Sequence, residues 1–146
     1  SPKATRPWQH VLEPLSGYLT LAKNLYASSE NHGESFNFGP RAEKPRTVIE
    51  LIQFLGNSYI HKSDKNPYVV TDEIPFHEAG LLKLNCEKAL QKLGWEATLN
   101  YEECISMVGE WYKAYQSSPE SALTVSQDQI RQYQMEALHR GRVWSK

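Results

Sequence analysis

The chain has 146 residues, of which 40% are apolar and 23% charged, so it is long enough for one globular domain with a sizeable core. Basic and acidic residues nearly balance, 16 against 17, and this argues against a nucleic-acid-binding protein with its usual excess of positive charge. No apolar run reaches the roughly 18–20 residues of a membrane span, and the first residues lack a signal-peptide core, so no membrane partner is expected.

The N-terminal segment predicts a short strand, over residues 6–11, that leads into a helix. Side chains alternate across a strand, so Arg6, Trp8 and His10 would share one face. A cation, an indole and an imidazole displayed together could bind an anionic ligand that carries a ring. Taken alone, however, these residues are better explained as a surface strand with a packed tryptophan and a solvated arginine.

The first helix is expected over residues 13–27. Pro14 suits the first turn of a helix, and Glu13 is favoured near the positive helix end. Apolar side chains recur at helical spacing and predict the buried face: Leu12, Leu15, Leu19, Ala22 and Tyr26. A polar loop then leads to a second short strand, over residues 35–39, which ends at a Gly-Pro pair.

The middle of the chain predicts one capped helix and two extended runs. Thr47 and Glu50 form a capping box that opens a helix, and Gly56 is well placed to stop it. A strand is expected over residues 68–71, because this run is rich in β-branched residues. A second short extended run is expected over residues 81–84. The dense basic patch at residues 41–46 contains a glutamate and a proline, and it is interpreted as a solvated loop.

Two more helices follow, each opened by an asparagine. Asn85 caps the first, with Gly94 just past its end, and Asn100 opens the second, with two glutamates in its first turn. The aromatic side chains Trp111, Tyr112 and Tyr115 on the second helix are expected in the core. Residues 117–128 are the expected linker to a loosely docked last helix that could start at Ser126.

These elements predict a mixed α/β fold with helix in excess, divided into residues 1–118 and a C-terminal helical tail, residues 119–146. Cys86 and Cys104 lie 18 positions apart with no CxxC motif, on apolar helix faces, and are expected as buried free thiols in a reducing cytoplasm. The five histidines are scattered and predict no metal site.

Motifs of cofactor chemistry are absent from the sequence. The eight glycines never form the closely spaced pattern that lets a backbone approach a dinucleotide pyrophosphate. No tyrosine is followed four positions later by a lysine. The sequence therefore predicts no catalytic and no cofactor-binding residue in this chain.

Four ordered segments nevertheless resemble one enzyme family. The first is Arg6-Pro-Trp-Gln-His-Val-Leu-Glu-Pro14 with the residues up to Leu19. The others are Phe36-Asn-Phe-Gly-Pro40, His77-Glu-Ala79 with Leu82-Lys-Leu-Asn85, and Lys88-Ala89 with Leu93-Gly-Trp95. Together they resemble the C-terminal part of CDP-glucose 4,6-dehydratases, members of the extended short-chain dehydrogenase/reductase superfamily.

The resemblance implies the C-terminal portion of an extended Rossmann-type enzyme. The first helix and the strand at residues 35–39 would complete the dinucleotide-binding sheet, and the later elements would build a small nucleotide-sugar lobe. NAD and the catalytic residues would belong to a missing N-terminal Rossmann part of a longer, cytoplasmic, homo-oligomeric protein. The product would be a CDP-4-keto-6-deoxy sugar, a precursor of sugars in bacterial surface polysaccharide.

The resemblance also implies roles for five residues in binding CDP-glucose. Arg6 would meet the diphosphate, and Glu78 would accept hydrogen bonds from the ribose hydroxyls. The relatives carry an arginine shortly before that acid, which this chain lacks, and His77 could replace it or be structural. Trp8 and His10 could flank the cytosine or the sugar, although packing is the more probable role of Trp8.

Two other functions stay open at this point. A sister epimerase or reductase acting on another nucleotide sugar would differ only in upstream acid and base residues. A non-catalytic domain that binds a nucleotide sugar or a protein on the same scaffold is the alternative from another class.

Overall fold

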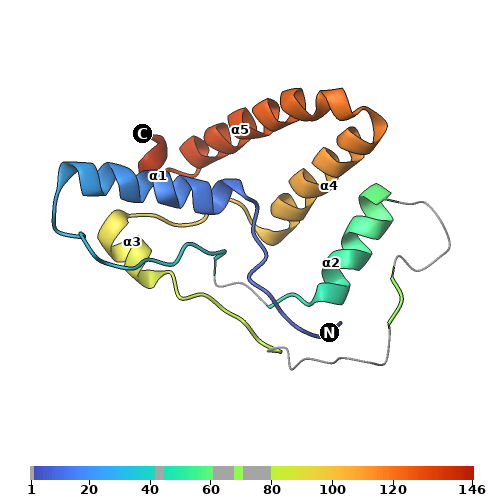
Figure 1. Cartoon of the computed structure of the whole chain (residues 1–146), viewed down its shortest axis with the longest axis horizontal. Helices are drawn as coiled ribbons and strands as arrows, with labels where there is room; N and C mark the ends of the chain where they lie inside the picture. The colour runs from blue at the N-terminus through green and yellow to red at the C-terminus, as the bar shows by residue number, and fades with distance from the viewer. Residues whose placement is uncertain (1, 42–44, 61–67, 71–79) are drawn as a thin grey trace.

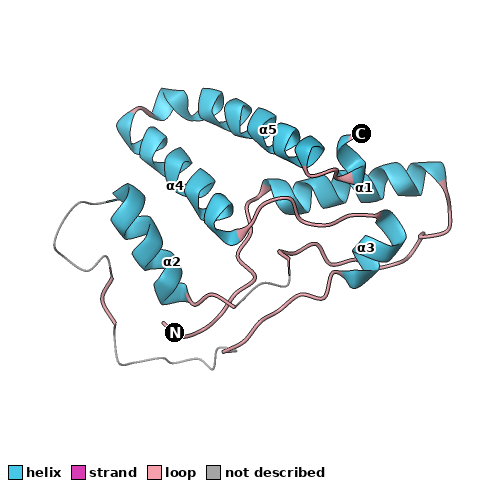
Figure 2. Cartoon of the chain, turned by 180° about the vertical axis from the view of Figure 1, so that it is seen from behind, coloured by secondary structure: helices cyan, strands magenta, loops and turns pink. Residues whose placement is uncertain are grey.

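The computed structural model describes residues 2–41, 45–60, 68–70 and 80–146. Helices form all of its regular structure within these ranges, and Figure 2 shows them joined by extended loops. The helices are α1 (Leu12–Ala27), α2 (Val48–Leu55), a π-helical turn (Gly56–Ile60), α3 (Glu87–Leu93), α4 (Tyr101–Ser117), a 3-10 turn (Pro119–Ser121), α5 (Ala122–His139) and a last 3-10 turn (Val143–Ser145). No helix in the described ranges is both long enough and apolar enough to cross a membrane.

The long helices α4 and α5 run as two arms from a turn, and the C-terminal half of α5 lies beside α1 (Figure 1). Expected strands at residues 6–11, 35–39 and 81–84 are extended loops instead, and the described residues of the 68–71 run form none either. Thr5 makes only isolated bridges, antiparallel to Thr47 and parallel to Leu81. A strand requires a partner along its length, and these segments meet at single points. The mixed α/β class of the fold stays a prediction.

Helix α1 begins within one residue of its predicted start, but its buried face differs from the predicted one. Glu13, Ser16 and Gly17 are buried, whereas Leu19 is 72% and Tyr26 96% exposed. The reason is close packing at Gly17, where an added Cβ would lie 2.4 Å from the Phe38 ring. Of the predicted face, only Leu12 packs against the core, and the other four residues are exposed: Leu15, Leu19, Ala22 and Tyr26.

The capping signals of the sequence at α2 and α4 are confirmed. Thr47 and Glu50 make a reciprocal capping box at α2, and Asn100 and Glu103 make another at α4. At α3 the N-cap is Cys86 rather than the predicted Asn85, although the Asn85 side chain accepts from the backbone N–H of Glu87. The helix ends, as predicted, at a left-handed Gly94. The α-helix ends at Leu55 with Gly56 as its C-cap, as predicted, and the π-helical turn follows directly.

The C-terminal tail is closely packed. Residues 117–128 do not form a linker, since α4 ends at Ser117 and α5 already begins at Ala122, four residues before the expected start. Gln129, Tyr133 and Ala137 of α5 are buried. The tail therefore contributes to the core, and the proposed domain boundary at residue 118 stays a prediction.

Two small clusters form the core. In the first, the Phe38 and Trp95 rings meet edge to face with centroids 4.9 Å apart. The second contains Leu99, Met107 and Tyr133, beside the half-buried Trp144.

The aromatic cluster on α4 does not join either core, contrary to expectation. Tyr112 is 53% and Tyr115 45% exposed, and the Trp111 indole donates to Ser126 Oγ at 2.9 Å. Both cysteines are free thiols, as predicted, with Cys104 buried and Cys86 half-buried.

Replacing Gly17 with alanine tests the packing of α1. The new methyl would overlap the Phe38 ring, so we expect Gly17→Ala to lower the free energy of unfolding by about 1–3 kcal/mol. Urea denaturation of the chain measures this. Gly80→Ala is the control, because nothing lies within 4 Å of its Cβ position. Equal stability of both variants would contradict the packing described at Gly17.

Candidate functional site

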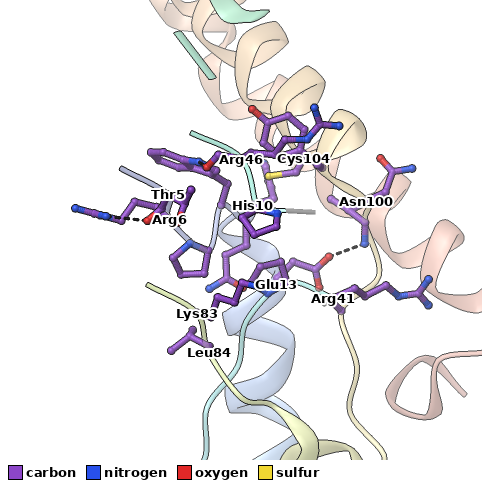
Figure 3. A pocket seen from close by; sticks show the side chains of 18 of the residues that line it. Thr5, Arg6, His10, Glu13, Arg41, Arg46, Lys83, Leu84, Asn100 and Cys104 are labelled. Carbon is purple, nitrogen blue, oxygen red and sulfur yellow. Dashed lines mark hydrogen bonds between the residues drawn. The ribbon is translucent and has the colours of Figure 1, made fainter. Parts of the chain in front are cut away.

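A cavity of about 150 Å³ lies beside the N-terminal segment. Its walls come from that segment, the loop before α2, the segment before α3 and the start of α4 (Figure 3). Arg6, Trp8 and His10 all line it, so the structure brings these three predicted site residues together. Their role in ligand binding stays a prediction.

Side-chain hydrogen bonds fix the N-terminal segment in place without a sheet. The Trp8 indole donates to the carbonyl oxygen of Arg46 at 3.1 Å, and Gln9 Nε2 donates to that of Phe38 at 3.1 Å. Arg6 Nη1 donates to the carbonyl oxygen of Thr5 at 2.7 Å, at the edge of the group in Figure 3. The segment is thereby held between the loops on either side of it.

His10 contributes a neutral imidazole to the cavity wall. Its side chain is 5% exposed, and burial lowers the pKa of the imidazole, although a hydrogen bond with Gln129 opposes this effect. Nδ1 accepts from the backbone N–H of Leu12 at 3.3 Å. His10 can therefore offer a ring surface to a ligand, while its nitrogens serve the protein.

Four cationic side chains line the cavity: Arg6, Arg41, Arg46 and Lys83. Arg46 pairs with Glu102 at 2.9 Å, and its guanidinium lies 4.9 Å from the centre of the Tyr101 ring. Arg41 pairs with Glu96 at 3.2 Å. The basic patch expected as a solvated loop thus supplies two cations to the cavity. The density of positive charge at residues 41–46 was visible in the sequence. The sequence around the loop did not show that it folds against the cavity.

The remaining titratable groups of the cavity do not suit nucleophilic or metal chemistry. Burial raises the pKa of the Cys104 thiol to about 12, so it stays protonated and unreactive. Burial also raises the pKa of the Tyr101 hydroxyl. Among the described residues, no three His, Cys, Asp or Glu side chains come close enough to hold a metal ion. The cavity is suited to binding.

His77 and Glu78 lie outside the described residues. Their predicted roles beside the phosphate and the ribose, and the expected proximity of Glu78 to Arg6, therefore stay predictions.

Comparison with known proteins supports the resemblance. No protein-family model matches the chain. Over 133 residues it is 37% identical to a CDP-glucose 4,6-dehydratase of Salmonella typhimurium strain LT2, a match that covers 91% of this chain. It covers 36% of the Salmonella protein, so the chain spans about a third of that relative's length. The predicted resemblance to one part of a CDP-glucose 4,6-dehydratase is thereby confirmed.

The buried imidazole predicts acid sensitivity of the fold. Because burial holds the folded-state pKa of His10 below the ordinary imidazole value of about 6.5, the unfolded chain takes up this proton first as the pH falls. The free energy of unfolding should be fully maintained above about pH 6.5 and decrease below it. Urea denaturation at pH 7 and pH 5 measures the loss. His10→Asn, which keeps an acceptor for Leu12 but does not titrate, should lose less over this interval, and an equal loss would contradict the assignment.

Proposed function

We propose that this chain is the substrate-holding part of a nucleotide-sugar 4,6-dehydratase that converts CDP-glucose to CDP-4-keto-6-deoxyglucose. The observation that carries the proposal is the cavity, which Arg6 and Trp8 of the family-like segment line together with the cationic residues Arg41, Arg46 and Lys83. The Salmonella relative is named a CDP-glucose 4,6-dehydratase, which supports this choice of substrate.

In this proposal the diphosphate lies against the cationic side of the cavity. Guanidinium groups bind phosphate oxygens in pairs and stay charged at all relevant pH values. Arg6 and Arg46 come from separate segments, 40 positions apart, so they can approach one diphosphate from two directions. Binding and orientation of this kind contribute heavily to rate even when the reacting groups lie elsewhere.

The residues of this chain do not fit NAD. They include neither a glycine-rich dinucleotide turn nor a tyrosine–lysine pair at the required spacing. We therefore assign NAD and the catalytic groups to a separate Rossmann part of a longer enzyme. A sister epimerase or reductase would use the same binding cavity. A non-catalytic domain that binds nucleotide sugars is the candidate that this lack of catalytic motifs favours.

The outer face of α1 supports a contact between this chain and the proposed Rossmann part. Leu15, Leu19 and Tyr26 form an exposed apolar stripe along the helix. Contiguous exposed apolar surface marks sites of protein contact, and the proposed occupant is the Rossmann part of the same protein. We also propose a cytoplasmic, homo-oligomeric enzyme, and the free thiols of Cys86 and Cys104 suit a reducing compartment.

Calorimetric titration of the chain with CDP tests the binding function. Arg6→Ala should weaken CDP binding about ten- to a hundredfold, because a charge-assisted hydrogen bond contributes about 1.5–3 kcal/mol. Arg131→Ala is the control, since that arginine is exposed on α5 and pairs with Asp128 away from the cavity. The absence of CDP binding to the unaltered chain would refute the proposed function.

The proposed separation of substrate binding from catalysis gives a second test. The chain alone should neither bind NAD nor turn over CDP-glucose, because the groups for both lie outside it. Fluorescence titration with NAD and chromatography of the sugar nucleotide measure these properties. Turnover of CDP-glucose by this polypeptide alone would contradict the assignment of catalysis to another part.

A further inference from the structure

Two polar atoms in the cavity have no hydrogen bond within the part of the chain that the structure describes. Gln9 Oε1 and the Tyr101 hydroxyl are buried, and neither has a partner among the described residues. Both side chains line the same cavity. Buried polar atoms nearly always have a partner, because a missing one costs free energy. The two atoms therefore mark positions where a bound ligand can make hydrogen bonds.

The orientation of the Gln9 amide defines what such a ligand must offer. Its Nε2 donates to the carbonyl oxygen of Phe38 at 3.1 Å, and the flipped amide would place two acceptors against each other. The atom left over is therefore Oε1, which can only accept. A ligand at this place must carry an N–H or O–H donor. The Tyr101 hydroxyl can donate or accept, so it accommodates a second polar group.

The size of the cavity limits the group that it can enclose. A space of roughly 150 Å³ holds one six-membered ring such as benzene. A whole nucleotide sugar is several times larger, so only one of its rings can enter. The walls include Pro7, Trp8, Leu84 and Leu99, which are apolar or aromatic. Such walls favour a flat ring over a sugar, whose hydroxyl groups would lose their water.

Charge decides which end of the ligand enters. The Glu13 carboxylate lines the cavity, and it would repel a phosphate placed beside it. The cations Arg41 and Arg46 keep side-chain exposures of 43% and 34%, so they are accessible to phosphate from solvent. A neutral ring inside and phosphates against the exposed cations satisfy both constraints.

We propose that the cavity encloses the nucleobase of the nucleotide, with Gln9 and Tyr101 as the residues that contact it. An N–H group of the base donates to Gln9 Oε1, and the Tyr101 hydroxyl donates to a ring carbonyl oxygen. Cytosine carries both groups, an amino group and a carbonyl oxygen. This inference rests on the proposed function, because it presupposes a nucleotide ligand.

A pair of ligands tests the contact with Gln9. CDP is compared by calorimetry with the 5′-diphosphate of the pyrimidin-2-one ribonucleoside, which keeps the ring and its carbonyl but has no N–H donor. The analogue would leave Oε1 without a partner, so it should bind about ten- to a hundredfold more weakly. Equal affinities would overturn the inference. Glucose 1-phosphate is the third ligand, and tighter binding of it than of CMP would show that the cavity takes the sugar instead.

Two tyrosine variants test the contact with Tyr101. Tyr101→Phe removes a hydroxyl that makes no hydrogen bond to the described residues, so the melting temperature should not fall, while CDP affinity should fall about three- to tenfold. Tyr115→Phe is the matched control, because Tyr115 lies on the same helix, is 45% exposed and does not line the cavity. It should leave CDP affinity unchanged. Unchanged CDP affinity of Tyr101→Phe would overturn the role of Tyr101.

The experiments separate failure of this inference from failure of the proposed function. If CDP and its analogue bind equally and Arg6→Ala weakens both, nucleotide binding stands and the position of the base is wrong. If neither nucleotide binds, the proposed function fails, and the inference fails with it. The ligand comparison uses the unaltered chain, so it decides even if a variant does not fold.

Discussion

The buried carboxylate of Glu13 is the interaction on which the described structure depends. It accepts from the backbone N–H groups of Thr98 and Leu99, at 2.9 and 2.6 Å, and from the Tyr133 hydroxyl at 2.8 Å. A buried charge is tolerated only where hydrogen bonds replace its water. One side chain near the start of α1 thereby ties together segments that lie 85, 86 and 120 positions away in the sequence.

The cavity follows from this anchor. Leu99 is fixed by Glu13, and the next residue, Asn100, caps α4 and sets the direction in which Tyr101 enters the helix. Arg140, the C-cap of α5, strengthens the same junction, since it donates to the carbonyl oxygen of Thr98 and pairs with Glu103 at 2.6 Å. Ser16 extends the network, because it accepts from the Trp95 indole at 2.9 Å. The wall that carries Tyr101 is thus held in place by contacts within the protein.

The sequence predicted the features that depend on local chemistry. Capping boxes and the glycine after α3 act over three or four residues, so their residue types suffice to place helix ends. The prediction of the buried face of α1 was wrong, because the contact of Gly17 with Phe38 across a loop decides which face is buried. The expected strands failed for the same reason, since pairing is a long-range property. Arg6, Trp8 and His10 were predicted together because they fall within five consecutive residues, whereas Arg46 and Tyr101 reach the cavity only through the fold.

The ion pairs around the cavity explain how a chain of net charge −1 can still receive an anion. The pairs of Arg41 with Glu96 and of Arg46 with Glu102 are partly exposed, with carboxylate exposures of 42% and 54%. Exposed pairs of this kind contribute only about 0–1 kcal/mol, so a diphosphate can replace the carboxylates at little cost. Glu13 behaves differently, because its hydrogen-bond donors are backbone amides and a buried hydroxyl. These donors cannot turn away to solvent. The inner carboxylate is therefore fixed in position while the outer pairs are exchangeable, and this asymmetry orients a ligand that has an anionic and a neutral end.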